Sequence, residues 1–303
     1  MFVRKGRSGR GQFARLFAAR LALAVLGLLV WACGALATEL KIATWNLNWL
    51  TLHAPGDRAL PQDVHPRADG DFERLRSYAA ELNADVVAIE EVDGRAAAQL
   101  VFPRERYSIH LTHDDVVQRV GFAVRRGLHY DVNPDYAALV DAEPNMHLRS
   151  GADITLRLPA GPLRLLAVHL KTGCFEGPVG HARRAACQEL AAQLPPLEAW
   201  IAARRDEGVA FVVLGDFNRR MDGADPFWSA LSKAAPLVRA TEGYVSPCWG
   251  RESFIDHILV GGAARDWLVP GSLRVLTYRE AGEAWKERLS DHCPVSVRLR
   301  VPE

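Results

Sequence analysis

Asp291 and His292 stand side by side near the C-terminus of the chain. A histidine held by a carboxylate can take a proton from water near neutral pH. Pro294 ends this short loop, and residues 295–300 then alternate between apolar and polar side chains as a half-buried strand does. Taken alone, such a pair is more often a surface turn than a catalytic site. The pair indicates a catalytic site only if other reactive side chains accompany it.

Polar side chains of suitable types also follow several other apolar runs. These residues are Asn46, Glu91, His169, Asp216, Asn218 and Asp256. Each has an ordinary explanation on its own, as a turn, cap or core residue. A rigid scaffold, however, presents ligand-binding groups on the loops that follow its strands. Together these residues supply what metal-assisted hydrolysis of a phosphodiester needs: a cation site, donors to the phosphoryl oxygens and a base for water.

The types of side chain also select among metals. Mg²⁺ takes oxygen ligands from few carboxylates and keeps several waters, which suits one glutamate with neighbouring Asn and Asp residues. The Cys and His spacing typical of zinc sites does not occur. We therefore expect Mg²⁺, with Mn²⁺ or Ca²⁺ as alternatives. An aspartate beside the histidine would fix its tautomer and stabilise the imidazolium that forms.

Short apolar runs and helical patterns alternate along the chain. We expect strands at residues 39–46, 86–89, 107–111, 120–124, 152–158, 163–169, 209–214, 253–260 and 295–300, and helices at 72–82, 94–100, 181–205 and 283–288. Pro195 and Pro196 predict a break in the third helix. Residues 51–70 form a long loop of the kind that is often functional, and residues 127–147 look irregular. Without repeats or low-complexity linkers, residues 38–303 are expected to form one α/β domain.

The charge is unevenly distributed along the chain. The 303 residues carry a formal net charge of +1, but residues 1–37 contain six Lys or Arg and no acid. The remainder holds 31 of the 37 basic residues and all 36 acidic ones, a charge of about −5. Nucleic-acid binding by that part must rest on local basic groups and metal, not on global charge.

Residues 1–37 are typical of a secretory signal peptide. Basic residues extend to Arg20, the apolar run 21–31 follows, and residues 35–37 read Ala-Leu-Ala, which suits cleavage. The apolar run is short for a transmembrane helix. A retained anchor and a lipoprotein formed at Cys33 are the alternatives. We expect export, to the periplasm or the medium.

Cleavage there would leave an even number of cysteines, which in an exported protein indicates disulfides. They are Cys174, Cys187, Cys248 and Cys293. Three pairings are open. We favour Cys174–Cys187, the nearest in sequence, which leaves Cys248–Cys293; four free thiols are the alternative. The second bond would tether the His292 loop to the segment that leads into Asp256.

Several short signatures occur in the order of one known family. They are Thr44-Trp-Asn-Leu-Asn48, Asp85-Val-Val-Ala-Ile-Glu-Glu-Val92, Val168-His-Leu-Lys171, Gly215-Asp-Phe-Asn218, Ile255-Asp-His-Ile258 and Ser290-Asp-His-Cys-Pro294. On these residues the chain resembles the endonuclease/exonuclease/phosphatase superfamily, the DNase I-like proteins, as an exported member of bacterial type. The resemblance implies a four-layer α/β sandwich of two packed mixed β-sheets, with the site at the strand ends. It also implies a hydrolase of phosphate esters.

The resemblance suggests which residues bind. Glu91 and Asn46 resemble the glutamate and asparagine at the family's metal, and Asp291 would be a further metal ligand or a site acid. Arg149 falls where a phosphate-binding arginine is expected. Glu90 occupies a position where family members often have Gln.

It also suggests which residues act on the substrate. His292 resembles the general base and Asp256 its orienting carboxylate. Asp216 and Asn218 resemble the pair that orients water and contacts the phosphate. His169 resembles the second histidine, a donor to phosphate oxygens or an acid for the leaving group.

The chain departs from secreted nucleases such as DNase I just before residues 120–124. Those enzymes carry a Tyr and a Glu there, the Glu holding the second histidine. This chain has Gln118 and Arg119. Gln118 could hydrogen-bond His169 but could not hold it charged, and Arg119 becomes a candidate for phosphate contact.

We therefore expect an exported, Mg²⁺-dependent phosphodiesterase that hydrolyses nucleic acid with little sequence specificity, as a monomer without a stable protein partner. The alternative is a phosphatase or phospholipase C-type enzyme acting on inositol phosphates or sphingolipid headgroups. The negative charge of residues 38–303 and the missing Tyr and Glu favour that alternative. A binding module on an inactive scaffold is disfavoured, because every expected site position holds a competent residue.

Overall fold

The computed structural model describes residues 38–141, 148–179, 184–250 and 252–303. The signal peptide expected at residues 1–37 lies outside these ranges. Residues Glu39–Val301 form one compact unit.

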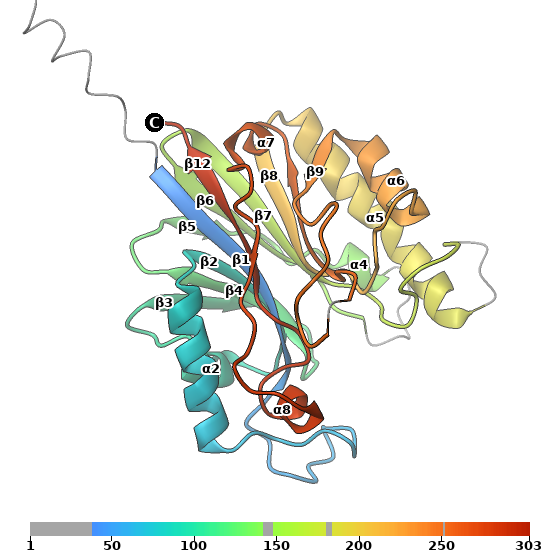
Figure 1. Ribbon diagram of the computed structural model, residues 1–303. Helices are drawn as coiled ribbons and strands as arrows, with labels where there is room; N and C mark the ends of the chain where they lie inside the picture. Colours follow the sequence, from blue (N-terminus) through green and yellow to red (C-terminus); the bar gives the residue numbers. More distant parts are fainter. Residues whose placement is uncertain (1–37, 142–147, 180–183, 251) are drawn as a thin grey trace, which may run out of the picture. The chain divides into compact units, whose positions relative to one another are not determined.

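Six strands of alternating or fully apolar sequence form the first sheet, in the order β11-β12-β1-β2-β4-β3 (Figure 1). They are β1 (Thr38–Leu50), β2 (Val86–Val92), β3 (Tyr107–Leu111), β4 (Arg119–Arg125), β11 (Arg274–Val275) and β12 (Val295–Val301). β1 runs parallel to β2, and β2 antiparallel to β4, so the sheet is mixed. Since parallel strands end at the same edge, the last residues of β1 and β2 meet there. Asn46 pairs with Glu90 in this register.

Six further strands form the second sheet, in the order β5-β6-β7-β8-β10-β9. They are β5 (Tyr130–Val132), β6 (Ala152–Leu158), β7 (Gly161–His169), β8 (Ala210–Asp216), β9 (Leu237–Arg239) and β10 (Asp256–Gly261). β7 and β8 are parallel, and His169 pairs with Asp216. β10 is antiparallel to β8, and Asp256 pairs with Asp216. Three predicted site residues therefore lie in one row across the sheet.

Apolar clusters hold four layers together. The largest lies between the two sheets and includes Ile42, Phe122 and Leu165. A second packs α2 (Asp69–Leu82) and α3 (Arg95–Val101) on the first sheet. A third packs α5 (Ala185–Asp206) and α6 (Pro226–Ala234) on the second. The predicted four-layer α/β sandwich of two mixed sheets is confirmed (Figure 1). Short helices α4 (Ala138–Asp141), α7 (Ala264–Trp267) and α8 (Glu283–Arg288) complete the described elements.

Some local expectations differ from the structure. The break predicted at Pro195 and Pro196 is wrong, because α5 continues through both prolines. A proline inside a helix loses one hydrogen bond and crowds the preceding turn. Here burial of Leu197 and Trp200 in the third cluster offsets that cost. Residues 181–183, expected at the start of this helix, lie outside the described ranges.

The stretch 127–147, expected to be irregular, contributes β5 and α4. Asp71 precedes the helix expected at residues 72–82, but α2 begins earlier, at Asp69. Asp71 therefore lies in the first turn of α2, where its carboxylate accepts from the backbone N–H of Ala68.

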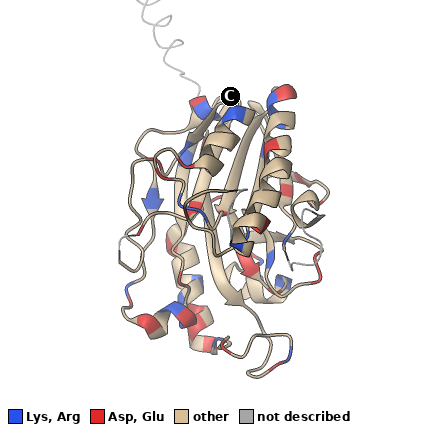
Figure 2. Ribbon diagram, turned by 90° about the vertical axis from the view of Figure 1, so that its right-hand side faces the viewer, with Lys and Arg blue, Asp and Glu red and all other residues tan. Residues whose placement is uncertain are grey.

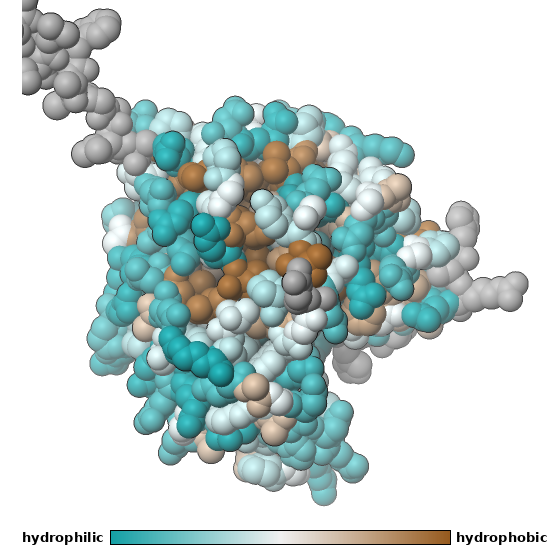
Figure 3. Space-filling model, viewed as in Figure 1, coloured by the Kyte–Doolittle hydropathy of each residue, from teal (hydrophilic) through white to brown (hydrophobic). Residues whose placement is uncertain are grey.

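The surface is mixed in character. Acidic and basic residues are interspersed in Figure 2 rather than gathered into a continuous basic stripe. The face in Figure 3 is largely hydrophilic, with apolar residues gathered in its middle. Among the described residues, no helix combines the length and hydropathy needed to cross a bilayer.

Candidate active site

The strand ends of both sheets meet in a cleft of about 380 Å³. Its lining includes these sequence-predicted residues: Glu91, Arg149, His169, Asp216, Asn218, Asp291 and His292. Asn46 and Asp256 contact this lining directly. Arg119 lines an adjoining groove of about 840 Å³, which shares Trp49, Gln118 and Arg149 with the cleft. The fold thus brings together groups separated by up to 246 positions in the sequence.

Glu91 and Asn46 join the two sheets at the floor of this cleft. The Asn46 Nδ2 donates to Glu91 Oε1 and to Asp216 Oδ2, both at 3.1 Å. Glu91 has a left-handed backbone (φ 59°) and interrupts the ladder between β2 and β4. Such a conformation costs about 1–3 kcal/mol outside glycine. The bulge directs the Glu91 carboxylate into the cleft, where its Oε2 also accepts from Trp49 N–H at 3.0 Å.

Glu90 points the other way, as the period of a strand requires. It is fully buried, and its Oε1 accepts from the Thr44 hydroxyl at 2.9 Å. Its Oε2 has no hydrogen-bond partner. Burial, and then the charges of Asp256 and Asp216, raise the pKa of Glu90 well above its usual value. Of the two adjacent acids, Glu91 alone lines the cleft.

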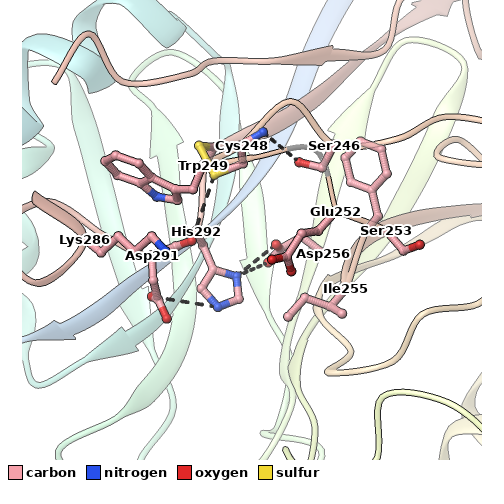
Figure 4. A pocket seen from close by; sticks show the side chains of 12 residues that line it. Ser246, Cys248, Trp249, Glu252, Ser253, Ile255, Asp256, Lys286, Asp291 and His292 are labelled. Carbon is pink, nitrogen blue, oxygen red and sulfur yellow. Dashed lines mark hydrogen bonds and ion pairs between the residues drawn. A yellow bond between two sulfur atoms is a disulfide. The ribbon is translucent and has the colours of Figure 1, made fainter. Parts of the chain in front are cut away.

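His292 is held by Asp256 at the start of β10. Its Nδ1 lies 3.0 and 2.9 Å from the two Asp256 oxygens, and its Nε2 lies 3.8 Å from Asp216 Oδ2. Figure 4 shows the imidazole between Asp256 and Asp291. Burial disfavours the imidazolium, but the carboxylates of Asp256 and Asp216 outweigh it and raise the pKa of His292 well above its ordinary value. This geometry leaves Nε2 available to the cleft.

His169 lies in a different environment at the end of β7. Its Nε2 is 3.7 Å from Glu91 Oε1 and 3.7 Å from Asp216 Oδ2, beyond hydrogen-bond distance. Its Nδ1 is buried without a hydrogen-bond partner. Burial, and then the cations Arg149 and His292, hold its pKa well below the usual value. His169 is therefore neutral around pH 7.

A tight turn presents Asp216 and Asn218. Gly215 has φ +144°, and a Cβ there would lie 1.9 Å from the carbonyl oxygen of Val168, so only glycine fits between the neighbouring strands. The Asp216 Oδ1 accepts from Asn218 N–H at 2.8 Å, and Asn218 Nδ2 donates to Asp216 Oδ2 at 3.0 Å. Burial raises the pKa of Asp216. The turn therefore fixes both side chains against each other.

The region before β4 arranges its side chains differently from the expectation for Gln118. Its Nε2 donates to Glu91 Oε2 at 2.5 Å rather than to His169. Arg119 donates to the carbonyl oxygens of Asp114 and Asp93. Arg149 lines the cleft directly, and burial lowers its pKa. Of the two arginines, Arg149 is the one that lines the cleft itself.

Some cleft residues were not singled out from the sequence. Trp49, Lys171, Thr172 and Phe175 also line it. Lys171 ends one of the signatures, so its position was a usable signal, but its Nζ pairs with Glu189 at 2.8 Å. Nothing in the periodicity marks Trp49 or Phe175, because Trp49 lies in the irregular end of β1 and Phe175 in the loop after β7.

Both expected disulfides are present, Cys174–Cys187 and Cys248–Cys293. The favoured pairing is confirmed, and the alternative of four free thiols is wrong. Cys248–Cys293 lines a pocket of about 240 Å³ beside His292, with Trp249 (Figure 4). This bond ties the segment before β10 to the histidine loop.

The cleft fits a divalent cation. Asp216, Asp256 and His292 offer ligand atoms that all lie within 4.8 Å of one another, so this group could hold a metal ion. Glu91 and Asp291 add two further carboxylates to the same lining. Partly buried like charges repel one another unless a cation is close. Oxygen donors of this kind suit a hard cation.

Comparison with known protein families gives a match that covers most of the chain. Residues 43–292 match the family described as "Endonuclease/Exonuclease/phosphatase family". No curated protein sequence matches the chain.

Several solved structures share the fold. TDP2 from C. elegans is 14% identical with a TM-score of 0.61, over 92% of this chain and 81% of that one. D. rerio TDP2 complexed with a single-strand DNA product is 16% identical with a TM-score of 0.56, over 86% and 98%. The 3'-5' exonuclease NExo from Neisseria meningitidis is 17% identical with a TM-score of 0.53, over 86% and 99%. At such low identity, these likenesses show the fold alone.

Proposed function

Because the chain belongs to the endonuclease/exonuclease/phosphatase family, and is thus a hydrolase of phosphoester bonds, we propose that it is an exported, Mg²⁺-dependent phosphodiesterase that cleaves nucleic acid with little sequence specificity. One observation carries this proposal. The Asp256–His292 pair faces the same cleft as the carboxylates of Glu91 and Asp216. A base for water and a cation site therefore lie within reach of one phosphate.

His292 is the proposed general base. Its Nε2 accepts the proton of the attacking water, while Asp256 at Nδ1 fixes the tautomer and stabilises the imidazolium that results. Asp216, 3.8 Å from that Nε2, orients the water. Asn218 is fixed against Asp216 and contacts the phosphate.

The remaining groups bind the phosphate and the cation. Glu91 and Asn46 would hold the ion, with Asp291 as a further ligand. We favour this set over Asp216, Asp256 and His292, because Asp256 and the Nδ1 of His292 already satisfy each other. When bound, the ion would neutralise charge on the phosphoryl oxygens and offset the carboxylates that raise the pKa of His292.

Two side chains complete the proposed phosphate site. Arg149 supplies a positive charge beside the phosphate. His169, being neutral, acts as a hydrogen-bonding partner of phosphate oxygens rather than as a cationic acid. Arg119, in the adjoining groove, is at most a secondary phosphate contact, because two backbone carbonyls already occupy its guanidinium.

The cleft surroundings support a nucleic-acid substrate. Trp49 and Phe175 lie among its lining residues, and bases stack on such aromatic side chains. Two structures of the same fold hold DNA: D. rerio TDP2 with a single-strand DNA product and NExo with a product DNA hairpin. Export, with residues 1–37 removed as a signal peptide, is supported by the two disulfides, which are typical of oxidising compartments.

One observation favours the second candidate, hydrolysis of inositol phosphates or sphingolipid headgroups. In the adjoining groove Asp93 and Asp115 offset part of the positive charge of Arg58, Arg119 and Arg149, so the groove offers no strongly basic track for a nucleic-acid backbone. A phospholipase C-type or phosphatase activity would use the same reactive groups on a smaller substrate.

Parallel assays decide between the two. Oxidised residues 38–303 would be incubated with plasmid DNA, single-stranded DNA, RNA, sphingomyelin and inositol phosphates, with Mg²⁺ and with EDTA. We expect Mg²⁺-dependent cleavage of the nucleic acids, lost in EDTA and restored by excess Mg²⁺. Turnover of sphingomyelin or inositol phosphates with intact nucleic acids would overturn the proposal in favour of the second candidate. Cleavage that persists in EDTA would contradict the metal requirement.

A further inference from the structure

The guanidinium of Arg67 hydrogen-bonds the backbone that follows Asn46. Its Nη2 donates to the carbonyl oxygens of Leu47 and Asn48 at 2.7 and 2.9 Å. Its Nη1 donates to that of Trp49 at 3.1 Å. Arg67 comes from the long loop between β1 and α2, so three consecutive carbonyls of one strand end converge on a distant side chain.

That strand end has a costly backbone. Asn48 and Trp49 have φ angles of 43° and 55°, and left-handed residues other than glycine each cost about 1–3 kcal/mol. The turn aims two donors at the site: Asn48 N–H donates to Asn46 Oδ1 at 2.9 Å, and Trp49 N–H to Glu91 Oε2 at 3.0 Å. The carbonyl bonds from Arg67 thus stabilise the conformation that orients Asn46 and Glu91.

The same guanidinium also binds the segment that leads to His292. Its Nε donates to the carbonyl oxygen of Arg288 at 3.1 Å, and its Nη2 to that of Leu289 at 2.5 Å. The next residue, Ser290, donates from Oγ to the Asn46 carbonyl at 2.7 Å and accepts from His292 N–H at 3.0 Å. Arg67 therefore holds two segments that are more than 200 residues apart in sequence, one carrying Asn46 and the other His292.

We propose that Arg67 is a positioning residue that sets the placement of His292 relative to Asn46 and Glu91. The inference rests on the proposed function, since it gives that geometry a catalytic consequence. It also gives the long loop a role, because the loop delivers this side chain. Burial lowers the pKa of Arg67 to about 10, so it keeps its charge at neutral pH.

Arginine is needed for geometric reasons. Five carbonyls from two segments surround one planar fork of donors. A lysine ammonium has three donors on a single atom and cannot span the same set. Arg67→Lys should keep the charge and lose part of the alignment.

The test compares Arg67→Ala and Arg67→Lys with a matched control, Arg125→Ala. Arg125 also holds a turn beside a left-handed residue, Asn83 (φ 45°). It donates to Asp85 Oδ1, Asn83 Oδ1 and the Ala84 carbonyl. It ends β4, whereas Arg119 at the beginning of that strand lies on the site side. The control therefore loses similar contacts away from the cleft.

Kinetics on bis(p-nitrophenyl) phosphate with saturating Mg²⁺ provide the readout. Because a misplacement of about 1 Å can cost about 10²-fold in rate, we expect Arg67→Ala to lower kcat about 10–100-fold while KM changes less than about 3-fold. Arg67→Lys should recover part of kcat. Arg125→Ala should lower the melting temperature and keep kcat.

The outcomes separate the two proposals. A wild-type protein without phosphodiesterase activity would overturn the proposed function. An active wild type with unchanged kcat in folded Arg67→Ala would overturn the positioning role alone. If Arg67→Ala does not fold, Arg67→Lys carries the test: wild-type kcat in that variant contradicts the role, and reduced kcat with a near-native melting temperature supports it.

Discussion

The two sides of the cleft hold their histidines in opposite ways. On one side, Asp256 contacts the Nδ1 of His292 with both oxygens at about 3 Å. On the other side, the nearest carboxylate oxygens stand 3.7 Å from the Nε2 of His169, and its Nδ1 is buried without a partner. One environment favours the imidazolium and the other the neutral ring. Burial is common to both, so the difference comes from the nearby charges.

The position of a histidine at a strand end therefore does not by itself indicate its catalytic role. Asp256 and Asp216 raise the pKa of His292 against the effect of burial. Burial and the cation Arg149 lower that of His169. The first environment suits a group that gains a proton during the reaction, and the second suits a neutral hydrogen-bonding partner. The following predictions test that division.

The largest effect is expected at His292. Replacing it with Ala removes the proposed base, and general-base catalysis contributes about 10²–10⁴-fold. Initial rates of DNA hydrolysis at saturating Mg²⁺ should fall by that factor. The exposed His113, paired with Asp135 outside the cleft, provides a control: His113→Ala should keep its rate. Full activity in His292→Ala would remove His292 from the mechanism.

Asp256→Asn tests the comparison because it removes the carboxylate charge that distinguishes the surroundings of His292 from those of His169. The rate should fall about 10²-fold or more, because an amide cannot stabilise the imidazolium. The acid limb of the pH–rate profile should also shift. A base works only when unprotonated, so the wild-type rate should increase with pH through the raised pKa of His292. Removing the Asp256 charge lowers that pKa, and the limb should shift to lower pH. A pH–rate profile with an unmoved limb would refute this assignment.

His169→Gln tests the other side, with a smaller expected loss of about 10-fold, typical of one hydrogen-bonding group. The pH–rate profile should keep the acid limb of the wild type, because burial and the nearby cations lower the pKa of His169, whereas that of His292 is raised. A limb that disappears in His169→Gln would show that His169 carries a catalytic proton and would reverse the division of roles.

The smallest effect is expected from the disulfides. Cys248→Ser should lower kcat a few-fold, because Cys248–Cys293 holds the His292 loop. Loss of such a bond typically also costs about 2–5 kcal/mol of stability. Cys174→Ser, on the His169 side, should cost stability with less effect on kcat. Thermal melts and kinetics of both variants, with dithiothreitol-treated wild type, measure the difference. Equal kcat in oxidised and reduced protein would show that the His292 loop keeps its position without the disulfide.

The strand positions could largely be predicted, because their pattern is local. Residues 107–111 and 152–158 alternate or are apolar, and the structure forms strands at those residues. Side-chain partners could not be predicted in the same way. From the sequence, Gln118 could have hydrogen-bonded His169; it instead donates to Glu91, since the bulge at Glu91 brings its carboxylate within reach.

By itself, the sequence determined which groups stand at strand ends and how many cysteines could pair, because alternation and counting need no knowledge of distant neighbours. It also determined that one of Glu90 and Glu91 faces away from the cleft, since adjacent strand residues point to opposite faces. Only the tertiary structure decided the charge environment of each histidine and revealed Arg67, whose carbonyl partners lie up to 222 positions away. Such contacts depend on how two sheets pack together, and no local pattern encodes that.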